Sequence, residues 1–174
     1  MKACVIVDEN VQDLVWGGGA NDRCDYRDLH RGLAYGTGPC RMAVLAVCDQ
    51  LLKRYSNAML DWLEEVDRLG RSEPVDGRRV ANETEWVVAS NLCRSTDDED
   101  RMLLGLARAS GARILATNDD QLTDDFRNRA IIDPPGAVYR KPAHNAALQK
   151  CCRQAGRTAA RRRSVRAIIR HASP

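Results

Sequence analysis

Three short apolar runs, each followed within two residues by an aspartate, constrain the fold of this chain more than any other feature. They are ACVIV at residues 3–7, MAVLAVC at 42–48 and RILAT at 113–117. Each run is typical of a short strand that is buried on both faces. The segments between them have helical periodicity, and strands that alternate with helices predict a parallel sheet with crossover helices.

The rest of the chain adds further elements to this α/β pattern. We expect helices over 9–16 and 25–35, and a longer helix from Asp49 that breaks near Ser56 and Asn57. We also expect a polar loop at 71–79, a helix within 80–93, a short helix over 120–128 and a fourth strand at 130–132. A further helix is expected to begin at Thr96, which forms a capping box with Glu99, and to end at Gly111.

Length and composition indicate a globular protein. A chain of 174 residues suits a single domain, and its 44% hydrophobic and 29% charged residues are ordinary for one. No apolar run approaches the roughly 20 residues that a membrane-spanning helix needs. The amino-terminal sequence MKACVIVDEN turns acidic too early for a signal peptide. We therefore expect a cytoplasmic protein that makes no membrane contact.

The cysteines argue against a zinc site. There are seven of them, no CxxC pair is present, and the three histidines are scattered. Cys4 and Cys48 lie inside apolar runs, where cysteine behaves as a small hydrophobic residue. We expect both to be reduced, buried thiols, which also fits a reducing compartment.

Charge divides the chain into an acidic body and a basic end. The segment 134–174 holds ten Lys or Arg residues and no Asp or Glu. We expect a domain over 1–140 and a basic arm over 141–174, either helical or loosely attached. Phosphate contacts are expected from Arg161, Arg162, Arg163 and Arg166. A solvated tail, or contact with an acidic protein partner, would explain the same arm.

Acidic residues stand where a parallel sheet binds its ligands. Asp8 and Asp119 follow buried strands, at the carboxyl ends where ligands of such sheets lie. Asp100 opens the helix between them in the sequence. Crowded carboxylates cost free energy, which a divalent cation would offset. For several acids a structural role is the simpler interpretation: helix caps at Asp49, Asp97, Asp98 and Glu99, and a solvated face at Asp120, Asp124 and Asp125.

Two stretches resemble the PIN-domain family. They are VIVDEN at 5–10 and DRMLLGLARASGARILATND at 100–119, and the order of elements is similar from about residue 3 to residue 140. The resemblance implies a three-layer α/β/α fold with a central, mostly parallel sheet of four to five strands. It also implies a ribonuclease that uses Mg²⁺ or Mn²⁺.

The resemblance assigns roles residue by residue. Asp8, Asp100 and Asp119 match the acids that hold the metal and activate a water for phosphodiester hydrolysis, and Asp97 is an auxiliary ligand. Asn10, Thr117 and Asn118 are expected to contact these acids or the RNA. The family also implies a toxin of a toxin–antitoxin or defence system, with an antitoxin or other protein partner, and a homodimer.

One position departs from the family pattern. Many members carry a Glu before the Tyr in the helix after the second strand, but Arg54 precedes Tyr55 here. Asp49, Glu64 or Glu65 would replace that acid, or the site works with fewer acids. The remaining alternative is an inactive PIN-like domain that binds RNA or a protein partner. A phosphatase or receiver using Asp8 is disfavoured, because no Lys ends the run at 113–117.

Overall fold

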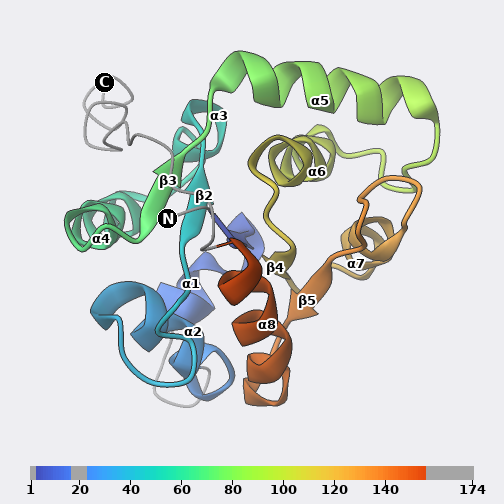
Figure 1. Ribbon diagram of the computed structural model, residues 1–174. Helices are drawn as coiled ribbons and strands as arrows, with labels where there is room; N and C mark the ends of the chain where they lie inside the picture. The colour runs from blue at the N-terminus through green and yellow to red at the C-terminus, as the bar shows by residue number, and fades with distance from the viewer. Residues whose placement is uncertain (1–2, 17–22, 156–174) are drawn as a thin grey trace.

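A computed structural model describes residues 3–16 and 23–155 (Figure 1). Within these residues five strands form one parallel sheet, in the order β3-β2-β1-β4-β5. The strands are β1 (Val5–Val7), β2 (Leu45–Val47), β3 (Ser72–Pro74), β4 (Ile114–Ala116) and β5 (Ala137–Tyr139). The expected α/β class, with a parallel sheet of four to five strands, is confirmed.

Helices cover both faces of the sheet and give three layers. Those of the described residues are η1 (Glu9–Val11), α1 (Gln12–Trp16), α2 (Arg23–Tyr35), α3 (Asp49–Leu52), α4 (Asn57–Arg68), α5 (Gly77–Ser90), α6 (Asp98–Ser110), α7 (Asp120–Arg127), η2 (Pro142–His144) and α8 (Asn145–Ala155). In Figure 1, α2, α4 and α8 lie on one side of the sheet, and α5, α6 and α7 lie on the other. None of these helices is long and apolar enough to cross a bilayer.

The central strands are continuously apolar because both of their faces are covered. Every residue of β1, β2 and β4 is buried. In the register of β1 and β4, Val7 pairs with Ala116. The residues that follow the two strands, Asp8 and Thr117, are therefore neighbours at the carboxyl edge.

The expected break after the second strand is confirmed. A short helix, α3, ends at Leu52, and α4 begins at Asn57. Ser56 caps α4, since its hydroxyl accepts a hydrogen bond of 3.3 Å from the backbone N–H of Met59. The helix expected within 80–93 is also present as α5.

Two local expectations about the sheet are wrong. The stretch 71–79 is not only a polar loop, because it contains β3. This strand lies at the edge, where Glu73 and Pro74 are partly exposed and polar residues or proline are tolerated. Residues 130–132 form no strand. Ile131 and Ile132 are buried in a turn in which both of their N–H groups donate to the Asn128 carbonyl.

The helix α6 begins one residue later than expected. Its N-cap is Asp97, whose Oδ1 accepts a hydrogen bond of 2.7 Å from the Glu99 N–H. Thr96 is exposed and does not cap the helix. At the other end Gly111 terminates α6 at a φ of 78°, as expected.

The last described helix is joined covalently to the residue that precedes the first strand. Cys4 and Cys152 form a disulfide across 148 positions of sequence, so the expectation of a reduced thiol at Cys4 is wrong. No local pattern reveals such a pairing, because it depends on where α8 packs. Leu148 of α8 is fully buried. Cys48 is a buried thiol, as expected.

Candidate functional site

The site is built around Asp8, which follows β1 and is 3% exposed. Its Oδ2 accepts a hydrogen bond of 2.6 Å from the Thr117 hydroxyl, and its Oδ1 accepts a longer one of 3.4 Å from the Asn10 N–H. The pKa of Asp8 is raised to about 6, mainly by burial; these two hydrogen bonds lower it, and the negative charges of Asp100 and Glu9 act in the same direction as burial. The carboxylate is therefore a buried negative charge beside other acids.

Side chains from the ends of β1 and β4 interlock around Asp8. The Asn10 amide donates to Thr117 Oγ1 at 3.4 Å, and the Asn118 N–H donates to Asn10 Oδ1 at 3.4 Å. The Asp119 N–H donates to Thr117 Oγ1 at 3.0 Å. The residues that the resemblance selected on these two segments are thus brought together.

Asp119 begins α7 as its N-cap. Its Oδ1 accepts a hydrogen bond of 2.7 Å from the Leu122 N–H. A carboxylate has two oxygens, so capping the helix leaves its other oxygen for a second partner.

Asp100 lies in the first turn of α6, and its charge acts on Asp8. The Ser95 hydroxyl donates to its Oδ2 at 2.5 Å. Burial raises the pKa of Asp100, and the negative charges of Asp119, Asp97 and Asp125 raise it further. Asp100 is thus within electrostatic reach of both Asp8 and Asp119. Asp97 stands one turn earlier as the helix cap.

A buried carboxylate that was expected on a solvated face fixes the loop before α6. Asp125 is 1% exposed and accepts hydrogen bonds of 2.9 Å from the Arg94 N–H and 3.0 Å from the Ser95 N–H. It thereby places Ser95 against Asp100. The expectation holds for Asp120 and Asp124, which are exposed, and is wrong for Asp125.

Glu99 belongs to the site and was missed as a site residue. It is 8% exposed, and its Oε2 accepts a hydrogen bond of 2.6 Å from Arg54. Its Oε1 is buried and has no hydrogen-bond partner among the described residues. The pKa of Glu99 is raised to about 7, mainly by burial; the neighbouring Glu9 carboxyl and the charge of Asp8 act in the same direction, and Arg54 opposes them. Arg54 was the signal that could have revealed Glu99, since a cation beside a cluster of acids needs an anionic partner.

Three other acids were expected to replace the Glu that is absent at position 54, and they lie elsewhere. Glu65 pairs with Arg68 on an exposed part of α4, and Glu64 is exposed. Asp49 lies against Gly77 at the start of α5, where a Cβ on the glycine would come within 2.5 Å of Asp49 Oδ1.

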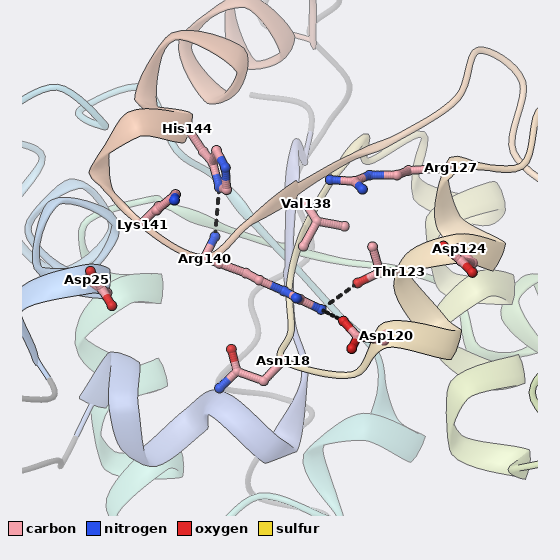
Figure 2. Close-up of a pocket in the computed structure, with 10 residues that line it drawn as sticks. All are labelled: Asp25, Asn118, Asp120, Thr123, Asp124, Arg127, Val138, Arg140, Lys141 and His144. Carbon is pink, nitrogen blue, oxygen red and sulfur yellow. Dashed lines mark hydrogen bonds and ion pairs between the residues drawn. The ribbon is translucent and has the colours of Figure 1, made fainter.

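Arg140 was also missed, and it braces the loop after β4. Its guanidinium donates to the Thr117 carbonyl at 2.9 Å and to the Asp119 carbonyl at 3.1 Å. It also donates to Asp120 Oδ1 and Thr123 Oγ1, both at 2.9 Å (Figure 2). A single side chain thus fixes the backbone on both sides of Asn118.

The donors of the site suit a hard cation. Carboxylates and a hydroxyl are the oxygen ligands that Mg²⁺ and Mn²⁺ prefer. Among residues 3–16 and 23–155, however, no three His, Cys, Asp or Glu side chains form a group that could hold a metal ion as they are placed. Arg161, Arg162, Arg163 and Arg166 lie outside the described residues.

No protein-family model, no curated protein and no solved structure matches the chain.

Proposed function

We propose that the protein is a ribonuclease that depends on Mg²⁺ or Mn²⁺, with Asp8, Asp100 and Asp119 as its metal-binding and catalytic acids. The observation that carries the proposal is the buried Asp8, whose raised pKa reflects the nearby charge of Asp100 as well as burial. A fold retains such a destabilising group mainly where function needs it. The sequence resemblance to PIN domains supports the same three acids.

Neighbouring side chains of the protein would hold the three metal-binding acids in position. Thr117 orients Asp8, Ser95 orients Asp100, and Arg140 fixes the backbone that carries Asp119. A bound cation would offset the crowded negative charge, stabilise charge on the phosphate and lower the pKa of an attacking water. Glu99, one residue before Asp100, adds a fourth carboxylate to the same region.

The second candidate function is an inactive PIN-like module that binds RNA or a protein partner. The ion pair between Arg54 and Glu99 favours it, because the cation already offsets one negative charge of the cluster. The absence of a ready metal-holding group among the described residues favours it as well. Both candidates share the fold, and they differ in whether the acids bind a metal.

Cleavage of RNA by the purified full-length chain separates the two candidates. The reactions contain Mg²⁺, Mn²⁺ or EDTA, with the wild type, Asp8→Asn, Asp100→Asn and Asp98→Asn. Asp98 is the matched control, since it lies on the same turn of α6 but its side chain is 93% exposed and pairs with Arg101. We expect metal-dependent cleavage that Asp8→Asn and Asp100→Asn lower by at least about 100-fold, whereas Asp98→Asn does not. Cleavage that survives Asp8→Asn would refute the assignment, and no cleavage of any RNA would favour the binding module.

A further inference from the structure

A cavity of about 550 Å³ lies where β4 and β5 end (Figure 2). Asn118 and Asp120, the neighbours of Asp119 in the sequence, form part of its wall. Arg127, Lys141 and His144 line it from α7 and from the segment after β5. Pockets of this size hold small organic ligands, and this one adjoins the proposed catalytic site.

Three acids and three bases line the cavity, and Arg94, which lies outside the lining, pairs with one of the acids. Arg140 pairs with Asp120 at 2.9 Å, and Asp124 pairs with Arg94 at 3.0 Å, so these lining groups are compensated. Within the described part of the chain, neither Arg127 nor Lys141 forms an ion pair. Both are exposed, and only Asp25 remains among the lining residues to oppose them. With Arg94 counted as the partner of Asp124, Arg127 and Lys141 exceed Asp25 by one positive charge.

His144 adds a hydrogen-bond donor to these cations. Its Nδ1 accepts a hydrogen bond of 3.0 Å from the Arg140 backbone N–H, which leaves the ring proton on Nε2. Burial lowers the pKa of His144, and the positive charges of Lys141, Arg127 and Arg140 lower it further. The ring is thus a neutral donor in a positive field.

We propose that this cavity binds a phosphate of the RNA strand that flanks the bond to be cleaved, through Arg127 and Lys141, with His144 Nε2–H as a third donor. The proposal rests on the proposed function, because it takes RNA as the substrate of the adjoining acids. Two cations without an ion pair and a neutral donor at one opening suit a phosphodiester, whose two non-bridging oxygens share one negative charge. The shared wall at Asn118 and Asp120 would place the rest of the strand at Asp119.

The test measures RNA binding without cleavage. The full-length protein is titrated, in EDTA, into a fluorescein-labelled single-stranded RNA of about 12 nucleotides, and anisotropy is recorded from ~50 to ~200 mM salt. The double variant Arg127→Ala, Lys141→Ala is compared with the control Arg41→Ala, Arg68→Ala. The control removes the same charge from exposed residues that precede β2 and β3, the two strands farthest from β5 in the sheet.

We expect the cavity variant to bind about tenfold more weakly and to lose about 0.7 from the salt slope, the value for one lost phosphate contact on a single strand. The control should bind as the wild type does. Equal affinity and slope for the cavity variant and the control would overturn the proposal, as would a wild type that binds no RNA. His144→Gln keeps a side-chain N–H donor and should retain more affinity than His144→Ala; no difference between them would remove His144 from the proposal.

Cleavage assays separate this proposal from the nuclease itself. If the wild type binds RNA through Arg127 and Lys141 but cleaves none, the cavity proposal stands and the nuclease fails. If the wild type cleaves RNA and the cavity variant has an unchanged KM, the nuclease stands and the cavity proposal fails. If both hold, the cavity variant raises KM by about the factor by which it weakens binding.

Discussion

The Thr117 hydroxyl donates a hydrogen bond of 2.6 Å to Asp8 Oδ2, across 109 positions of sequence. The two residues are close in space because β1 and β4 are adjacent and in register. Asp8 follows β1 and Thr117 follows β4, so both lie at the same edge of the sheet. The hydrogen bond orients one oxygen of a buried acid and lowers its pKa against the effect of burial. The fold thus holds Asp8 at a cost in stability, and that cost can be measured.

Asp8→Asn should stabilise the protein near neutral pH. Folding raises the pKa of Asp8 from 3.8 to about 6, so the folded state binds the proton more tightly. Stability therefore falls as pH rises from 3.8 to about 6 and stays lower above it, by up to about 3 kcal/mol. The variant removes this cost. Urea unfolding should show a larger gain for Asp8→Asn near pH ~7.5 than near pH ~5. A variant less stable than the wild type near pH ~7.5 would contradict this account.

Arg54→Met should lower stability only where Glu99 is ionised. Burial raises the pKa of Glu99 to about 7, so its ion pair with Arg54 is fully charged above that pH and is lost as pH falls below it. Arg54 is 45% exposed, so we expect a loss of no more than about 1 kcal/mol near pH ~8.5 and almost none near pH ~5.5. A double-mutant cycle with Glu99→Gln at both pH values gives the coupling. An equal coupling free energy between Arg54 and Glu99 at both pH values would rule out titration of Glu99 between them.

Arg140→Met should loosen the loop that carries Asp119. The variant loses four hydrogen bonds to oxygens of residues 117–123, and a cost of about 2–3 kcal/mol is expected. Arg129→Met is the control, since Arg129 is 80% exposed and, among residues 3–16 and 23–155, its one ion pair is with Asp133. It should change the free energy of unfolding by less than about 0.5 kcal/mol. Similar losses in both variants would show that Arg140 does not brace the site.

Cys152→Ser should destabilise the oxidised protein, whereas Cys151→Ser should not. Cys152 bonds to Cys4 across 148 positions, and Cys151 on the same helix is a free thiol. Removal of a disulfide costs about 2–5 kcal/mol. Thermal unfolding should therefore separate the two variants without reductant and bring Cys152→Ser and the wild type together with reductant. If reductant leaves the unfolding temperature of the wild type unchanged, the disulfide is absent in solution.

The parts of the fold that follow from local pattern were predictable. The three apolar runs are buried on both faces, so their composition identifies β1, β2 and β4 and places Asp8 and Asp119 at one edge. The edge strand β3 carries Ser, Glu and Pro because it is covered less, and the same composition is typical of a loop. Ile131 and Ile132 show the converse, since they are apolar and buried without pairing in a strand.

The missed parts of the site depend on contacts between distant segments. Glu99 has the sequence context of a helix cap, and only the approach of Arg54, 45 positions earlier, makes it a buried charged partner. Arg140 has no motif of its own, and its role follows from the proximity of β5 to the end of β4. Position in a capping pattern cannot distinguish Asp97, which caps α6, from Glu99, which enters the cluster.

The Cys4–Cys152 bond has a mechanical consequence. The two Cα atoms are 5.2 Å apart, and the bond closes nearly the whole described chain into a ring. Tension applied between the two ends of the chain passes through the sulfur atoms, so the sheet between Cys4 and Cys152 carries no load. The hydrogen bonds that align Asp8 with Thr117 lie inside that ring. While the bond is intact, pulling on the termini leaves the alignment of Asp8 and Thr117 undisturbed.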